Sequence, residues 1–154
     1  MRPLNKNIKV KIDYPNILTS DVYRINFEHF GLTIGYIEFS EIFNGQDDDD
    51  LTEEEYDELF PDDKYVYILQ VYVDRNWRGK GIANNLINKF FEFCEDEFPD
   101  NLEFALNASP MELSIPLNYL IRFYETFGFE PIPKLSYPDN CTMIKSNRKL
   151  INNN

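Results

Sequence analysis

The sequence predicts an α/β domain, a sheet flanked by helices, on three observations. An apolar strand, a basic glycine-rich turn and the start of an amphipathic helix follow one another from Val71 to Ile87. Several other segments alternate apolar and polar residues with the period of a strand. A second helical segment stops at Gly128, where a left-handed residue is expected. The 154 residues suffice for one domain with a substantial core, and the 43% apolar content excludes a largely disordered protein.

Strands are predicted where apolar residues alternate or run together between turn residues. The segment from Ile8 to Tyr14 alternates with period two and ends at Pro15. Two further strands, joined through Gly31, are expected to form a hairpin. The second half of the segment 64–73 is apolar on both sides, which is typical of a buried central strand. The other predicted strands cover residues 22–30, 32–42, 102–106, 129–132 and 142–145.

Two helices are predicted after the central strand. The second helix is expected to be capped by Ser114, to have Pro116 in its first turn and to end at Gly128 in a left-handed C-cap. The first helix runs from Gly79 to Phe98, and its apolar stripe consists of Ile82, Leu86, Phe90, Phe93 and Cys94.

The turn between the central strand and the first helix predicts an anion site. A helix N-terminus leaves backbone N–H groups without partners and carries about half a positive charge, so adjacent glycines turn it into a phosphate cradle. Arg78 and Lys80 add full charges. The turn lacks the Gly-Lys-Ser/Thr ending of a Walker loop, and no third glycine follows Gly81 at the spacing of dinucleotide folds.

Two blocks of residues resemble the GCN5-related N-acetyltransferase (GNAT) superfamily. Arg78, Gly81 and Ala83 match its Arg/Gln-x-x-Gly-x-Gly/Ala loop, which in that family holds the pyrophosphate of acetyl-coenzyme A (acetyl-CoA). Residues 123–129, Phe-Tyr-Glu-Thr-Phe-Gly-Phe, resemble the ending of its second conserved helix. The resemblance implies the GNAT fold, a central mixed, mostly antiparallel twisted sheet flanked by helices. Only residues 15–21 stand where the family usually has its first helical pair, so that pair is shortened or absent and the acceptor cleft is expected to be wide.

The same resemblance implies an N-acetyltransferase that transfers acetyl from acetyl-CoA to a primary amine. Tyr124 would protonate the departing thiolate, for which a phenol with a pKa near 10 is suited, or it only packs into the core. Asn118 stands one residue after the position, here Leu117, at which the family has its cofactor-contacting asparagine. A backbone N–H of the strand before the loop would contact the oxyanion. The residues implied for acetyl-CoA binding are Val71, Tyr72, Val73, Arg78, Gly79, Lys80, Gly81, Ile82, Ala83 and Asn118.

The general base is not evident in the sequence. Histone-type members of the family have a glutamate at the position that resembles Tyr67. Glu38 and Glu103 are possible substitutes for this missing base and would act through a water molecule. The alternative interpretation is that each is an ordinary surface carboxylate. The alternative function is therefore a catalytically silent GNAT-fold protein whose acidic segment binds a basic partner.

Negative charge is concentrated in one insertion, residues 46–63. The formal net charge is −12, yet Asp47 to Asp63 holds eleven acidic residues and no basic one, so the rest of the chain is nearly neutral. Thr52 followed by Glu55 is a capping-box pattern that would open a short helix. The insertion is interpreted as a solvated loop, or as an electrostatic lure for a cationic acceptor or a basic partner. Direct nucleic-acid binding is not expected, because the basic patch it needs is missing.

The remaining expectations concern organisation and location. One GNAT domain is expected over residues 1–150, followed by a disordered tail at 151–154, as a monomer or homodimer. The sequence shows no stretch with the length of a membrane span and no hydrophobic signal core, so a soluble cytoplasmic protein without a membrane partner is expected. Cys94 and Cys141 are interpreted as free thiols. No metal is expected, since the cysteines lack metal spacing and His29 is the one histidine.

Overall fold

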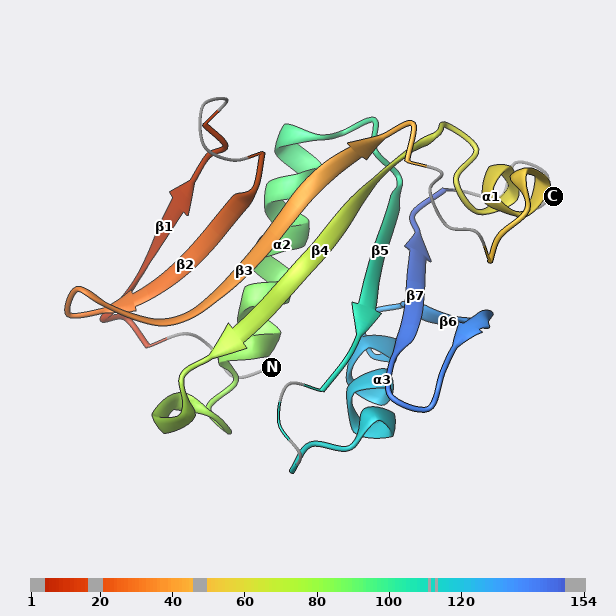
Figure 1. Cartoon of the computed structure of the whole chain (residues 1–154). Coiled ribbons are helices and arrows are strands. Elements are labelled where there is room, and N and C mark those ends of the chain that lie inside the picture. Colours follow the sequence, from red (N-terminus) through yellow and green to blue (C-terminus); the bar gives the residue numbers. More distant parts are fainter. Residues whose placement is uncertain (1–4, 17–20, 46–49, 111, 113, 149–154) are drawn as a thin grey trace, which may run out of the picture. The chain divides into compact units, whose positions relative to one another are not determined.

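The computed structural model describes residues 5–16, 21–45, 50–110, 112 and 114–148 (Figure 1). The strand order is β1-β2-β3-β4-β5-β7-β6. The pairs β1/β2, β2/β3, β5/β7 and β6/β7 are antiparallel, and the predicted mixed, mostly antiparallel sheet flanked by helices is confirmed. The elements are β1 (Ile8–Asp13), β2 (Tyr23–His29), β3 (Leu32–Phe43), α1 (Glu53–Leu59), β4 (Lys64–Val73), η1 (Arg75–Trp77), α2 (Ile82–Glu97), β5 (Glu103–Ala108), α3 (Leu117–Glu125), β6 (Glu130–Ser136) and β7 (Cys141–Ser146).

The chain divides into two compact units, and each unit draws on two separate stretches of sequence. Unit 1 consists of Met1–Ser40 and Ile68–Asp100, and unit 2 consists of Glu41–Tyr67 and Asn101–Asn154. Both β3 and β4 contribute residues to each unit. The expected single domain over residues 1–150 stays a prediction, and the expected tail at 151–154 lies outside the described residues.

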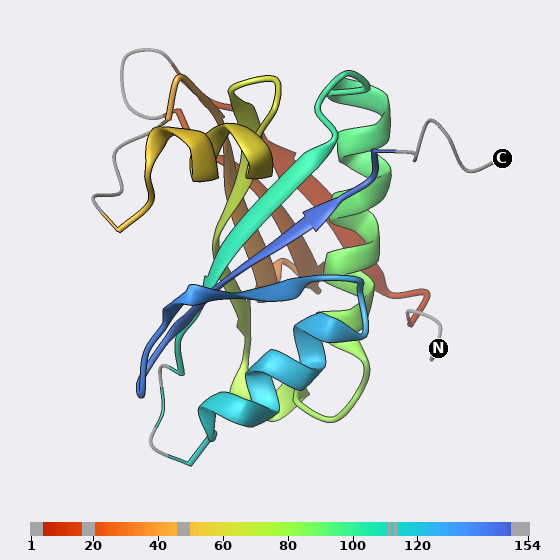
Figure 2. The ribbon, with the colours of Figure 1, turned by 90° about the vertical axis from the view of Figure 1, so that its right-hand side faces the viewer.

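In unit 1, helix α2 covers one face of the sheet made by β1, β2 and β3 (Figure 1 and Figure 2). The register sets Ile25 opposite Ile37 and Phe27 opposite Gly35, and all four residues are buried. The apolar stripe predicted for α2 is confirmed, because each of its residues is buried: Ile82, Leu86, Phe90, Phe93 and Cys94. Burial of these aromatic and aliphatic side chains is the main favourable term in the stability of this unit.

The predicted hairpin between β2 and β3 is confirmed. Its turn residues Phe30 and Gly31 both have positive φ, 49° and 81°, which suits the twist of a tight two-residue hairpin turn. The connection between β1 and β2 spans nine residues. Its described residues, 14–16 and 21–22, contain no helix, in agreement with a shortened or absent first helical pair.

In unit 2, the short helix α1 buries its apolar side. Tyr56 and Phe60 pack with Ala105 of β5. Leu51, just before the helix, forms a second cluster whose other buried members, Ile132 and Leu135, come from β6. Residues 51–60 of the acidic insertion are therefore folded onto this unit, which corrects their interpretation as a solvated loop.

The capping box predicted for this helix is also present. The Thr52 hydroxyl accepts a hydrogen bond from the Glu55 N–H at 3.1 Å, and the Glu55 carboxylate accepts one from the Thr52 N–H at 2.8 Å. Two backbone donors that the helix itself cannot satisfy are thereby paired. Residues 46–49 of the insertion lie outside the described residues.

Both long helices begin later than the sequence predicts. Helix α2 begins at Ile82 rather than Gly79, because the glycines at 79 and 81 have left-handed backbones with φ of 77° and 81°. Helix α3 begins at Leu117, and its N-cap is Pro116 in an extended conformation. Ser114 therefore does not cap it; Ser114 belongs to a preceding turn in which the Ile115 N–H donates to the Glu112 carbonyl.

Candidate functional site

The segment that joins β4 to α2 begins with a firmly anchored residue, Asp74. Its carboxylate caps η1 by accepting a hydrogen bond from the Asn76 N–H at 2.9 Å. Its backbone N–H donates to the Ile34 carbonyl of β3 at 2.8 Å. The start of the loop is therefore fixed to the sheet of unit 1.

Two glycines with left-handed backbones lead from this anchor into α2. Residues with a Cβ adopt the φ of Gly79 and Gly81 only at a cost, so the chain path depends on glycine at both positions. A Cβ built on Gly79 would meet no atom within 4 Å, so the space beside it is open. Gly81 is the N-cap of α2, and no side-chain hydrogen bond caps the helix there. The first-turn N–H groups are thus left for another acceptor, as the predicted anion cradle requires.

Exposed cations flank the two glycines. The Arg78 Nε donates to the Val73 carbonyl at 3.2 Å, and the Lys80 ammonium lies 5.0 Å from the centroid of the Trp77 ring. The Trp77 ring also packs against His29, with centroids 4.7 Å apart. Two positive charges are thereby held beside the loop, where charge-assisted hydrogen bonds to an anion are strong.

The strand residues before the loop present their N–H groups in alternation. Because the Asp74 N–H points toward β3, the N–H groups of Val73 and Val71 point toward the other side of β4. The Tyr72 carbonyl lies close to Gly35 of β3, 2.9 Å from the position of a Cβ there. Nine of the predicted site residues lie in this one segment of unit 1: Val71, Tyr72, Val73, Arg78, Gly79, Lys80, Gly81, Ile82 and Ala83.

The other two predicted site residues, Asn118 and Tyr124, lie on α3 in unit 2. Asn118 is exposed in the first turn of the helix. Tyr124 is half-buried near the helix end, with its ring edge-on to Phe129 at 6.1 Å between centroids. Burial raises the pKa of Tyr124 to about 12, so its phenol stays protonated at neutral pH. The roles assigned to both residues stay predictions.

The two carboxylates considered as general bases are both engaged by arginines. Glu38 accepts hydrogen bonds of 3.0 and 2.6 Å from Arg24. Arg24 also lies over the Tyr36 ring, 3.9 Å from its centroid. Both donors are nitrogens of one guanidinium, so the Glu38 carboxylate is engaged in an ion pair.

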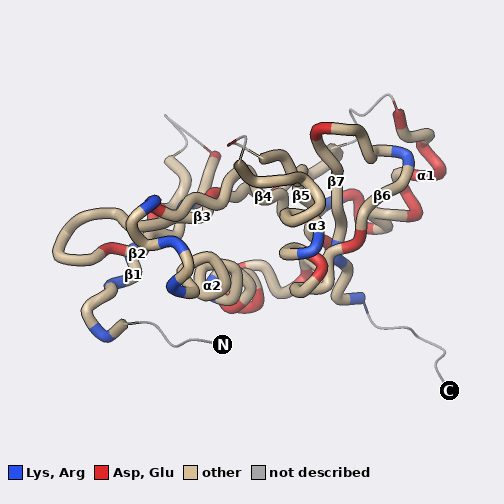
Figure 3. Tube along the Cα trace, turned by 90° about the horizontal axis from the view of Figure 1, so that it is seen from below, with Lys and Arg blue, Asp and Glu red and all other residues tan. Residues whose placement is uncertain are grey.

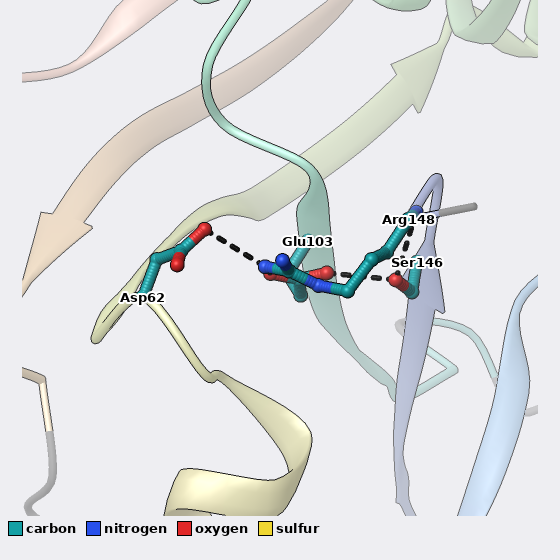
Figure 4. Close-up of polar contacts among 4 residues, drawn as sticks. All are labelled: Asp62, Glu103, Ser146 and Arg148. Atoms are coloured by element: carbon teal, nitrogen blue, oxygen red, sulfur yellow. Dashed lines mark hydrogen bonds and ion pairs between the residues drawn. The ribbon is translucent and has the colours of Figure 1, made fainter. Parts of the chain in front are cut away.

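Glu103 is not the surface carboxylate that the sequence suggested. Its side chain is 2% exposed, and both of its oxygens accept hydrogen bonds (Figure 4). Ser146 donates to one oxygen at 2.7 Å, and Arg148 donates to the other at 2.9 Å. Arg148 also donates to Asp62 at 2.8 Å, and the two carboxylates together raise the pKa of the guanidinium. The network links β5, β7 and the loop after α1, which is a structural role.

Tyr67, whose position resembles the one at which histone-type relatives have a glutamate, is half-buried, and this burial raises its pKa. A raised pKa keeps its phenol neutral, so Tyr67 is not a strong base in this state. Burial of Glu103 and of Tyr67 depends on which strands become neighbours, which local sequence patterns do not reveal.

Acidic residues of the insertion follow one another along α1 (Figure 3), and most of them are exposed. Glu55 is neutralised by Lys134 of β6 at 2.7 Å, which lowers the pKa of Glu55. Tyr137 of the β6–β7 turn donates a hydrogen bond to Asp50. Four further carboxylates of α1 are exposed and have no partner among the described residues: Glu53, Glu54, Asp57 and Glu58.

Within the described part of the chain, no group of three or more histidine, cysteine, aspartate or glutamate side chains is arranged to hold a metal ion. Cys94 and Cys141 are both buried, and neither forms a disulfide with a described residue. Among the described helices, none is long and apolar enough to cross a membrane.

The sequence model of the Acetyltransferase (GNAT) family matches residues 22–129. Among solved structures, Escherichia coli ElaA is 23% identical, with a TM-score of 0.56 over 83% of this chain and 70% of that protein. PaiA N-acetyltransferase from Thermoplasma acidophilum, in complex with coenzyme A, is 16% identical, with a TM-score of 0.56 over 84% of this chain and 64% of its own. Arabidopsis thaliana NAA60, in complex with a bisubstrate analogue, is 18% identical, with a TM-score of 0.59 over 84% and 78%. A search of curated proteins finds no match.

Proposed function

We propose that this chain, which belongs to the GNAT acetyltransferase family, is an N-acetyltransferase that transfers acetyl from acetyl-CoA to a primary amine of a cationic acceptor. The observation that carries the proposal is the pair of left-handed glycines, 79 and 81, at the uncapped start of α2. This arrangement fits a pyrophosphate, because backbone N–H groups and the helix dipole both favour an anion there. PaiA, a structural neighbour, binds coenzyme A, which supports the same cosubstrate here.

The residues that would hold acetyl-CoA are those of the β4–α2 segment. Gly79, Gly81, Ile82 and Ala83 would offer backbone N–H groups to the phosphates, and Arg78 and Lys80 would add charge. Val71, Tyr72 and Val73 would line the path of the pantetheine arm, and the Val71 or Val73 N–H would contact the oxyanion. Asn118 would contribute a polar contact from α3. Acetyl-CoA supplies the activated acetyl group when it is bound.

Tyr124 would act as the proton donor to the departing thiolate. Its phenol is protonated throughout the physiological pH range, as a donor must be, although burial raises its pKa to about 12 and so makes it a weaker acid than a solvated phenol. Glu38 and Glu103 are each paired with an arginine, so neither is proposed as the base. The acceptor amine is therefore expected to lose its proton to water or to a group on the acceptor itself, and the transfer rate is expected to rise with pH.

A cationic acceptor is supported by the exposed carboxylates of α1, four of which have no partner among the described residues: Glu53, Glu54, Asp57 and Glu58. Uncompensated charges of one sign attract oppositely charged ligands over about 8–10 Å at physiological salt. Polyamines, lysine and basic peptides are the acceptors that fit this charge.

The test combines binding with turnover. Thermal unfolding is measured with acetyl-CoA and with acetyl-pantetheine, which lacks the phosphates, and thiol release is followed with spermidine, lysine and a basic peptide. Stabilisation of about 2.7 kcal/mol is expected at a hundredfold excess of acetyl-CoA over its Kd, with much less for acetyl-pantetheine. Equal stabilisation by both compounds would contradict the phosphate site.

The alternative function is a silent GNAT-fold protein that binds a basic partner through α1. The arginine pairing of Glu38 and Glu103 favours it, because no carboxylate proposed as a base is free. Salt-sensitive binding of a basic peptide with no thiol release at any pH from 7 to about 9.5, where amines lose their protons, would support this alternative over the enzyme.

A further inference from the structure

The end of α3 is held by several hydrogen bonds, all within unit 2. The Tyr124 carbonyl accepts from the Phe127 N–H at 3.0 Å and from the Phe129 N–H at 3.3 Å. The Gly128 N–H donates to the Glu125 carbonyl at 3.0 Å, and Gly128 itself is left-handed with φ of 95°. This is a Schellman-type cap, and its 6→1 hydrogen bond ends on the Tyr124 carbonyl.

A lysine from a distant strand completes this cap. Lys145 of β7 donates a hydrogen bond through its ammonium to the Phe127 carbonyl at 2.9 Å. Its Nζ lies 2.7 Å from the position that a Cβ on Gly128 would occupy. The absence of a side chain at Gly128 therefore makes the room that the ammonium uses.

The charge of Lys145 also suits its location. The last carbonyls of a helix carry partial negative charge, and a cation there stabilises the helix end. The cap in turn packs Phe129, which is 1% exposed, edge-on against the Tyr124 ring. Fixing the cap therefore fixes both the backbone of Tyr124 and one wall of the space its ring occupies.

We propose that Lys145 is a positioning residue that holds Tyr124 in place through the α3 cap. The inference rests on the proposed function of Tyr124 as a proton donor, since positioning matters to turnover only if the phenol takes part. Lys145 would contact neither acetyl-CoA nor the acceptor. Its loss is therefore expected to lower kcat and to leave the KM for acetyl-CoA nearly unchanged.

The experiment compares Lys145→Met, Lys145→Arg and Tyr124→Phe with the double variant Lys145→Met/Tyr124→Phe. Lys89→Met is the matched control, because it removes a lysine whose polar contact among the described residues is a surface ion pair with Glu92 on α2. Lys145→Met is expected to lower kcat about tenfold, with partial rescue in Lys145→Arg, whereas Lys89→Met has no effect. In the double variant, the lysine substitution is expected to cause no further loss of kcat, because the effects of substituting two residues that act as one unit are not additive.

Amide hydrogen exchange provides a measurement that does not depend on activity. Faster exchange at Gly128 and Phe129 is expected in Lys145→Met and not in Lys89→Met. Unchanged exchange in Lys145→Met would overturn the proposal, as would an unchanged kcat.

The kinetic outcomes separate this inference from the proposed function. If Tyr124→Phe lowers kcat and the double variant lowers it further by the full effect of Lys145→Met, only the positioning role of Lys145 is overturned. Full activity in Tyr124→Phe would overturn both the proton-donor role and the positioning role.

Discussion

Gly35 of β3 lies directly against Leu86 of α2, so closely that a Cβ on Gly35 would stand 3.3 Å from a Leu86 methyl carbon. The same Cβ would lie 2.9 Å from the Tyr72 carbonyl oxygen and 3.1 Å from an Ile82 methyl. The Tyr72 carbonyl belongs to the backbone of β4, which cannot move away from Gly35 without disturbing the sheet. The start of α2, and with it the glycine loop, is thus brought close to the sheet by the absence of one side chain.

Gly35→Ala is expected to lower the free energy of unfolding by about 1–3 kcal/mol, the usual cost of overpacking a core. Urea unfolding followed by circular dichroism measures the change. Gly31→Asn is the control, because Gly31 has open space around it and asparagine tolerates a left-handed backbone. A Gly35→Ala protein as stable as the parent would show that α2 can shift freely on the sheet.

Gly81→Val is expected to weaken acetyl-CoA binding by well over tenfold, which is about 1.4 kcal/mol or more. The valine side chain would strain the left-handed backbone and obstruct the approach of the phosphates. Gly31→Val is a matched control, since Gly31 also has φ of 81° but lies at the β2–β3 turn. Calorimetry that finds equal affinities in the two folded variants would rule out the assigned loop.

Tyr124 is expected to make the protein less stable in alkali. Both states hold the phenolic proton below pH 10, the ordinary pKa, and only the folded state holds it between pH 10 and about 12. The unfolded state binds fewer protons in that window, so the free energy of unfolding falls as pH rises. Urea titrations from pH 8 to 11.5 measure the free energy of unfolding, which should fall less steeply with pH in Tyr124→Phe than in the parent. Tyr119→Phe, at a side chain 63% exposed, should follow the parent.

The α1 carboxylates are expected to set the salt dependence of acceptor binding. Converting Glu53, Glu54, Asp57 and Glu58 to Gln or Asn should lower the affinity for a basic peptide at low salt. The affinity of this variant should also fall less steeply as salt is added, because screening acts on exposed charges. Affinity for acetyl-CoA, which is itself anionic, should not fall. The matched control neutralises four acidic residues of α2 in unit 1: Glu92, Glu95, Asp96 and Glu97. An identical salt slope in both variants would show that α1 does not attract the acceptor.

Local sequence patterns were sufficient for the elements whose determinants lie within a few residues. The capping box of Thr52 and Glu55 and the left-handed Gly128 are decided by hydrogen bonds between near neighbours, and both are confirmed. The apolar stripe of α2 likewise records which side of that helix is buried. The alternation of β1 predicts the strand, although none of its residues is buried and Val10 is exposed. The helix starts were placed too early, because glycine and proline signals do not fix a first helical residue.

Only the tertiary structure decided which charges are paired and which are free. The carboxylate of Glu103 meets Arg148 across forty-five residues, and Lys145 reaches the Phe127 carbonyl across eighteen. Glu38 meets Arg24 through the register of β2 and β3. Such contacts depend on strand pairing and on space left by other side chains, which no local pattern records. The sequence by itself therefore determined the family, the glycine loop, the cap of α1 and the candidate donor Tyr124. Long-range packing determined that Glu38 and Glu103 are engaged and that the apolar side of α1 packs onto β5, with Leu51 just before the helix packing onto β6.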